Sequence, residues 1–198
     1  PAGPPLLRQA RHIARKRGWS EGNRAVLRAV LSLGFNFLLR SSEFLSRCSA
    51  GWHLNKVLRG VDVQLRRDGV PLGPEELHLA NEVAIFLRES KADQFNHGAL
   101  LVHHAAEDPS AFDLCPVRAI RDLLMMFPDR MTSEKERPLM RWESGEAVTQ
   151  GELRRILGQA GVAMGIPWES VGTHSLRFGG ASALFQCSGG NSALVKRL

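Results

Sequence analysis

The chain has 198 residues, of which 43% are hydrophobic and 23% are charged, a balance typical of one globular domain with a buried core. The formal net charge is +6, which favours a polyanionic partner. No apolar run approaches the length of a membrane span, and three dispersed cysteines indicate neither a disulfide framework nor a zinc site. We therefore expect an intracellular chain without a membrane partner.

Residues 1–19 are rich first in proline and then in arginine. Residues 1–5 indicate a loose tail, and residues 6–17 predict a short helix whose basic face lies against DNA. The candidate DNA-binding residues are Arg8, Arg11, Arg15, Lys16 and Arg17. The alternative is that these charges are merely solvated. We expect residues 1–19 to form a basic tail or linker and residues 20–198 to form the main domain.

A strongly apolar helix is predicted over residues 23–39, with Ser20 as a suitable cap. Its apolar stripe consists of Leu27, Val30, Leu31, Gly34, Phe37 and Leu38. The helix ends or bends at Arg40, and an arginine that follows so apolar a helix is expected to be partly buried. Because a buried guanidinium needs a partner, we expect Arg40 to pair with Glu43. The alternative interpretation is that Arg40 only forms a structural ion pair with Glu43.

Alternating apolar residues predict three β-strands, within residues 56–72, 81–90 and 98–104. Residues 66–69 have the composition of a turn. The three strands are expected to form a small antiparallel sheet. Lys91 falls between the last two strands, so we expect it on a strand end or hairpin, where the alternative is an ordinary solvated lysine.

Three further helices are indicated downstream, and they make the expected fold class mainly helical α+β. One begins at Pro116, and another follows Thr149, which forms a capping box with Glu152. The third is expected to be capped by Thr173, and its buried face to contain Leu176, Gly180, Ala183, Leu184 and Cys187. A last helix is expected to start near Asn191.

Four basic side chains follow defined breaks or element ends: Arg40, Lys91, His174 and Arg177. We expect them to converge on one phosphate. Two guanidinium groups stabilise the charge of a pentacoordinate phosphoryl transition state, while a lysine protonates a leaving oxygen and a histidine moves a proton. The histidines His97, His103 and His104 suggest a metal site, but the sequence places no fourth ligand near them. No metal and no other cofactor is therefore expected.

The boxes that hold these groups resemble those of the tyrosine recombinases, the phage-integrase-like enzymes. Residues 40–43, Arg-Ser-Ser-Glu, resemble the first-arginine box, and residues 173–182, which begin Thr-His-Ser-Leu-Arg, resemble the His-x-x-Arg box. Residues 90–95 and 114–119 are similar to the versions carried by eukaryotic mobile elements. The order and spacing of the boxes agree, so the resemblance covers roughly residues 20–198.

The resemblance implies metal-free cutting and rejoining of DNA through a 3′-phosphotyrosyl intermediate. It implies that Arg40 and Arg177 bind the non-bridging oxygens of the scissile phosphate and that Lys91 protonates the leaving 5′-oxygen. His174 then serves as acid and base for the nucleophile, and Glu43 supports Arg40. The implied partner is double-stranded DNA, on which the complete protein associates with itself, in the nucleus if the host is eukaryotic.

The chain departs from this family pattern because it contains no tyrosine. The family places a further His or Trp and then the tyrosine after the helix expected near Asn191, whereas this sequence ends at Leu198. We therefore expect a catalytic domain that is truncated before its nucleophile, inactive alone but able to bind DNA. Two alternatives stay open: a non-catalytic DNA-binding relic or accessory module of a mobile element, and an unrelated helical interaction domain whose basic surface is incidental.

Overall fold

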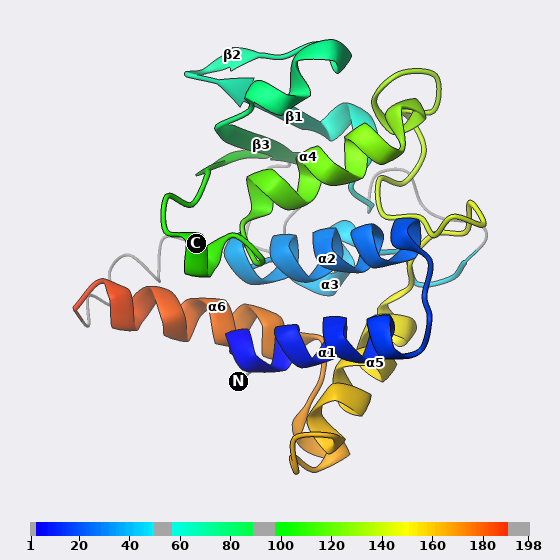
Figure 1. The fold of residues 1–198 in the computed structure, drawn as a ribbon, viewed down its shortest axis with the longest axis vertical. Helices are drawn as coiled ribbons and strands as arrows, with labels where there is room; N and C mark the ends of the chain where they lie inside the picture. Colours follow the sequence, from blue (N-terminus) through cyan, green and yellow to red (C-terminus); the bar gives the residue numbers. More distant parts are fainter. Residues whose placement is uncertain (1–2, 50–56, 89–97, 190–198) are drawn as a thin grey trace.

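A small sheet and six α-helices make up the part of the chain that the structure describes, which is residues 3–49, 57–88 and 98–189 of a computed structural model (Figure 1). The helices are α1 (Pro4–Lys16), α2 (Glu21–Asn36), α3 (Ser41–Phe44), α4 (Pro116–Met126), α5 (Gln150–Val162) and α6 (His174–Cys187). The strands are β1 (Val63–Arg67), β2 (Val70–Pro71), β3 (Glu82–Leu87) and β4 (Ala99–His104). None of these helices has the length and apolar character that crossing a membrane requires.

Helix α2 lies at the centre of the fold (Figure 1). On one side, α4 separates α2 from the sheet and contacts β1, β3 and β4. On the other side, α1 and α6 contact α2, while α5 packs against α1. Because α2 is enclosed from both sides, it is buried far beyond the single stripe that the sequence predicts: Val26, Ala29 and Leu33 are all fully buried as well.

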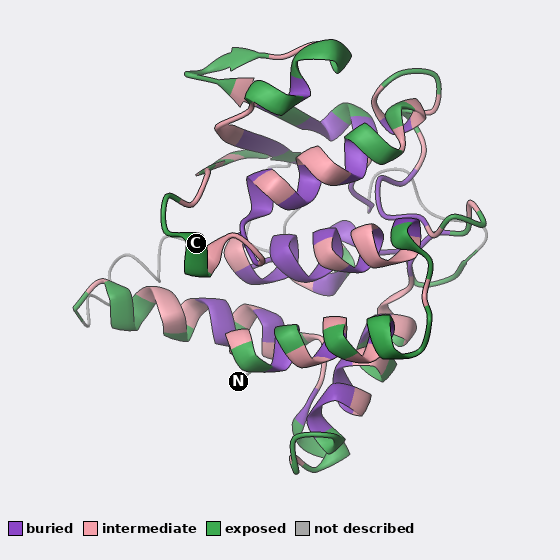
Figure 2. Cartoon of the chain, in the orientation of Figure 1, coloured by how far each residue is buried: buried purple, intermediate pink, exposed green. Residues whose placement is uncertain are grey.

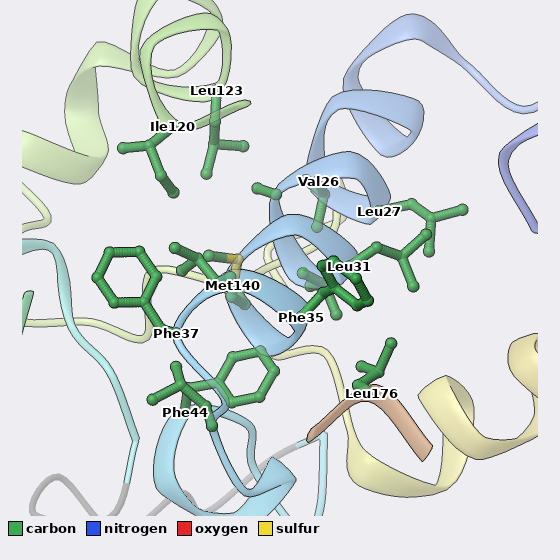
Figure 3. Packing of buried hydrophobic residues seen from close by; sticks show 14 of the residues in the cluster. Val26, Leu27, Leu31, Phe35, Phe37, Phe44, Ile120, Leu123, Met140 and Leu176 are labelled. Atoms are coloured by element: carbon green, nitrogen blue, oxygen red, sulfur yellow. The ribbon is translucent and has the colours of Figure 1, made fainter. Parts of the chain in front are cut away.

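The hydrophobic core gathers around α2 from the other five α-helices and from β1 and β3. Leu176 of α6, Phe44 of α3 and Ile120 of α4 surround the central residues of α2 (Figure 3). The buried residues accordingly follow α2 and the inner face of α4, while the far end of α6 is exposed (Figure 2). Each such side chain contributes about 1.5–3 kcal/mol relative to an exposed position, so the core fixes how α6 and α3 sit against α2.

The sheet is antiparallel throughout, with the strand order β2–β1–β3–β4. The predicted turn joins β1 to β2, and Asp68 and Gly69 adopt the left-handed φ values of 51° and 83° that a tight hairpin requires. The mainly helical α+β fold is confirmed, but the sheet has one strand more than the three expected. The extra strand, Val70–Pro71, has two residues and lies at the edge, where proline is tolerated and a periodic pattern is too short to detect.

Helix α1 covers most of the short helix predicted over residues 6–17, but it also includes Pro4 and Pro5, which were expected in a loose tail. The side chains of Leu6, Leu7, Ala10 and Ala14 are buried in the same core as α2. They recur every three or four residues, so one narrow stripe of α1 docks on α5 and α2 while the arginines stay outside. The division of the chain at residue 19 stays a prediction, although α1 shares the core of the following residues.

The two predicted helix starts at Ser20 and Thr149, which depend on local hydrogen bonds, are confirmed. The Ser20 hydroxyl accepts a hydrogen bond from the Asn23 backbone N–H at 3.2 Å, and α2 follows. At α5, the Glu152 N–H donates to Thr149 Oγ1 at 3.1 Å, while the Thr149 N–H donates to Glu152 Oε2 at 2.8 Å. This reciprocal pair is the predicted capping box. Helix α4 begins at Pro116, as expected.

Candidate functional site

Arg40 sits where the chain reverses between α2 and α3. Leu38, just after α2, has a left-handed φ of 54°, which costs a leucine about 1–2 kcal/mol and is held by its burial in the core. The reversal places Arg40 as the residue that precedes α3. The core therefore fixes the backbone that carries this arginine, so the position of Arg40 depends on packing as well as on its own contacts.

Glu43 is the partner that the sequence predicts for Arg40. Arg40 Nη1 donates to Glu43 Oε1 at 2.8 Å, and the Arg40 backbone N–H donates to Glu43 Oε2 at 2.7 Å. The Arg40 side chain is 28% exposed, whereas that of Glu43 is 8% exposed. No other carboxylate in the described residues pairs with Arg40, so the outer edge of its guanidinium can still donate to an anion.

The elements that carry Arg40 and Arg177 pack against each other at the end of α2. A Cβ atom built on Gly34 would lie 2.9 Å from Leu176 Cδ1 and 3.3 Å from Phe44 Cζ, so these two side chains meet over Gly34. Leu176 immediately precedes Arg177, and Phe44 immediately follows Glu43. The packing thus brings the first residues of α6 to the short helix that Arg40 caps (Figure 3).

His174 and Arg177 begin α6, as the sequence predicts, with His174 exposed and Arg177 half-buried. Neither side chain has a hydrogen-bond or ion-pair partner among the described residues. The expected Thr173 cap is wrong: its side chain accepts no hydrogen bond, and the N–H of Gly172 instead donates to Ser175 Oγ at 3.0 Å. Thr173 has helical backbone angles (φ −62°, ψ −30°), whereas a capping residue has an extended backbone, so its hydroxyl is not placed to cap the helix.

The predicted apolar face of α6 holds for its first half. Leu176 and Gly180 are buried, but Ala183 and Leu184 are half-buried and Cys187 is exposed. The correction has a simple geometric cause, because α6 runs past the end of α2 and so loses the surface that would cover its last turns (Figure 1). The helix is therefore anchored at the end that carries His174 and Arg177.

Lys91, the fourth predicted site residue, lies outside the described residues. Strand β3 ends at Leu87 and β4 begins at Ala99, so the chain between two paired strands contains this lysine. The residues predicted to start a helix near Asn191 also lie outside the described part, as does His97.

His103 of β4 packs against the end of α2. His103 Nε2 lies 3.1 Å from the Asn36 carbonyl oxygen, and its ring meets the Phe37 ring edge-on at 5.0 Å. Burial lowers the pKa of His103, and the hydrogen bond with the Asn36 carbonyl at the end of α2 opposes that shift in part. Within the described residues, no group of three or more His, Cys, Asp or Glu side chains is placed to hold a metal.

Three of the five basic residues proposed for DNA binding, on α1 and at its C-terminal cap, make tertiary contacts. Arg8 Nε donates to Asp113 Oδ2 at 2.9 Å, and Arg11 Nη1 donates to the Asp113 carbonyl at 2.8 Å. Arg17 Nη1 donates to Gln159 Oε1 at 2.7 Å. Arg15 and Lys16 are exposed and have no such partner in the described chain. The DNA-binding role of these five residues stays a prediction, and Arg15 and Lys16 are the two whose side chains are available to DNA.

Comparison with known proteins finds a similar fold among solved structures but no similar sequence. No family model matches the sequence, and no curated protein matches it either. The fold is that of a tyrosine-recombinase-like α+β core. Among solved structures, the chain is similar to the XerH site-specific recombinase bound to its difH substrate in a pre-cleavage complex, with a TM-score of 0.59 and 19% identity. The match covers 96% of this chain and 43% of that chain, so this chain spans less than half of the recombinase's length.

Proposed function

We propose that this chain binds duplex DNA and that, in a complete parent protein, its domain breaks and rejoins DNA strands through a phosphotyrosyl intermediate. The observation that carries the proposal is the packing of the Arg40 segment against the start of α6 at Gly34, within a recombinase-like fold. The fold neighbour is itself a site-specific recombinase with DNA bound, which supports DNA as the partner. The proposed setting is intracellular, and it is the nucleus if the host is eukaryotic; the proposed parent is of the eukaryotic mobile-element type.

The proposed chemistry needs no metal, because positive side chains supply the charge. Arg40, oriented by Glu43, and Arg177 bind the non-bridging oxygens of one phosphate and stabilise the charge that develops on them. Lys91 protonates the leaving 5′-oxygen, and His174 moves the proton of the nucleophile. The partial exposure of Arg40 and the absence of described partners for Arg177 support these roles, since both guanidinium groups keep N–H donors for an oxyanion.

The nucleophile has to come from outside this sequence, because the chain contains no tyrosine. We therefore propose that the chain alone binds DNA without cleaving it, and that cleavage requires a longer parent protein that associates with itself on DNA. The same observation favours one second candidate, a non-catalytic DNA-binding relic or accessory module. Extending the chain with the parent reading frame beyond Leu198 distinguishes the two, since a covalent protein–DNA adduct on a denaturing gel forms only with the enzyme.

DNA binding by fluorescence anisotropy tests the phosphate clamp, defined here as Arg40, Lys91, His174 and Arg177. Arg177→Ala is expected to weaken binding about tenfold or more, because a hydrogen bond to a charged group contributes about 1.5–3 kcal/mol. Arg40→Ala is expected to do the same, and Arg40→Lys, which leaves Glu43 a cationic partner, controls for misfolding. Neutralising Arg66 and Arg67 on β1 serves as the charge-matched control. Losses of equal size at all four arginines would contradict a focused site.

A further inference from the structure

Four arginine side chains line a pocket of about 310 Å³ between α1, α2 and α4. Arg11 and Arg15 come from α1, whereas Arg24 and Arg28 come from α2. About 18 Å of helix separate Arg24 from the end of α2, beyond which Arg40 lies, so this pocket is distinct from the phosphate clamp. The volume is at the lower end of the range for small-molecule sites and exceeds what one phosphate fills.

Two of the four arginines are fixed in place. Arg28 Nε donates to the Asp113 carbonyl at 3.2 Å, its Nη2 donates to the Phe112 carbonyl at 2.8 Å, and its Nη1 pairs with Asp122. Arg11 Nη1 donates to the Asp113 carbonyl at 2.8 Å. These contacts hold two positive charges rigidly against the loop before α4, which lowers the entropy cost of using them to bind an anion.

The other two arginines, Arg15 and Arg24, make no described contacts that fix their side chains. Arg15 is exposed and Arg24 is half-buried, and neither has a hydrogen-bond or ion-pair partner among the described residues. They approach the pocket from different helices, so their guanidinium forks are available to an incoming ligand with ten N–H donors between them. A pocket with two fixed and two free guanidinium groups is suited to an anion with several oxygens.

Positive charge is in excess at this pocket. Its acidic lining residues are Glu21 and Asp122, and Asp122 is already shared between Arg28 and Arg121, whose Nη2 donates to it at 2.8 Å. The pKa of Arg11 is lowered, first by burial and then by the positive charge of Arg28, and the Asp113 carboxylate compensates only in part. The folded chain thus holds like charges together at a cost that a bound anion would relieve.

We propose that this pocket binds a phosphate-bearing anion of about diphosphate size, with Arg11 and Arg28 as its fixed floor and Arg15 and Arg24 closing over it. The same chemistry has two sources, a free diphosphate group or neighbouring phosphates of a DNA backbone. The proposal does not rest on the phosphate clamp, because none of its residues belongs to the clamp.

Isothermal titration of the whole chain with inorganic pyrophosphate tests the proposal. The double variant Arg15→Gln, Arg24→Gln is expected to lose about tenfold in affinity for each arginine removed. The matched control Arg154→Gln, Arg155→Gln removes the same charge from exposed, unpartnered positions of α5 and is expected to change affinity less than about twofold. The proposal is overturned if the two double variants lose equal affinity for pyrophosphate, or if the Arg15→Gln, Arg24→Gln variant loses none.

A gain of affinity gives a second, independent readout. Glu21 is the one acidic lining residue without a described ion-pair partner, and it opposes a bound anion. Glu21→Gln is therefore expected to tighten pyrophosphate binding several-fold, an effect that a structural role of Glu21 does not produce. Unchanged or weaker binding in this variant, with folding verified by circular dichroism, counts against the proposal.

Two further arms identify the source and separate this proposal from the proposed function. The Arg15→Gln, Arg24→Gln loss is expected to persist in the Arg177→Ala background, because the two sites share no residue. If the loss disappears in that background, the anion binds at the clamp and the pocket is overturned. Competition by duplex DNA assigns the pocket to backbone phosphates, whereas simultaneous binding of DNA and pyrophosphate assigns it to a free ligand. A chain that binds pyrophosphate at the pocket but no DNA refutes the proposed function alone.

Discussion

Gly180→Ala tests whether the close approach of α6 to α2 determines the stability of the fold. A Cβ atom at Gly180 would lie 2.0 Å from the Phe35 carbonyl oxygen and 2.4 Å from Leu38 Cδ2. The leucine methyl can move, but the carbonyl belongs to the backbone of α2. To restore an ordinary contact, α6 must move away by about 1.5 Å, and the close-packed core around Leu176 resists that shift.

The expected loss follows from two opposing effects. Overpacking of a well-packed interface costs about 1–3 kcal/mol, while alanine gains up to about 1 kcal/mol over glycine in a helix. We therefore expect the free energy of unfolding to fall by about 1–2 kcal/mol. With a urea m-value of about 2 kcal/mol/M, the unfolding midpoint falls by about 0.5–1 M.

Gly151→Ala supplies the matched control for this measurement. Gly151 lies in the first turn of α5, and a Cβ there meets nothing closer than Thr149 Oγ1 at 4.0 Å. This variant has the helix-propensity gain without the clash, so its urea midpoint, followed by tryptophan fluorescence, is expected to stay equal or rise. If Gly180→Ala unfolds at the same urea concentration as Gly151→Ala, the close approach does not constrain α6 and the reasoning fails.

Two further predictions concern local interactions. Thr149→Ala removes the capping box of α5 and is expected to lower the free energy of unfolding by about 1 kcal/mol in urea titrations. Thr149→Ser keeps the hydroxyl and is expected to keep the stability of the unmutated chain. An equal loss in the serine variant would assign the effect to packing of the threonine methyl group. Because the folded chain lowers the pKa of His103 below its ordinary 6.5, the unfolded chain binds the proton first, and stability falls as pH drops below about 6.5. His103→Gln is expected to flatten this pH dependence, and an unchanged slope would assign it to other groups.

Apart from the Thr173 cap, the local features that the sequence predicts are confirmed, because their causes lie within a few residues. The caps at Ser20 and Thr149, the Asp68–Gly69 turn and the pair of Arg40 with Glu43 each depend on side chains no more than three positions apart. A hydrogen bond over that span needs only local backbone geometry, so the order of residue types is sufficient evidence for it.

What the sequence does not predict depends on contacts between distant segments. Arg8 finds Asp113 at a separation of 105 residues, and the core position of α1 depends on α5, far along the chain. Cys187 fits a helical stripe yet is exposed, because the length of α2 limits how much of α6 is covered. Periodicity identifies a face that is able to be buried, but only the tertiary arrangement decides whether another element covers it.

The sequence contains an indication of the arginine pocket in the spacing of its like charges, which an analysis of apolar periodicity does not consider. Arg11 and Arg15 are four residues apart on α1, as are Arg24 and Arg28 on α2, and like charges at that spacing destabilise a helix. Arg24 also lies near the N-terminus of α2, where the helix dipole disfavours a cation. Local rules are broken most often where a site requires it. Both pairs of like charges line the same pocket, so one bound anion relieves both conflicts, which is why we place the anion there rather than on the exposed arginines of α5.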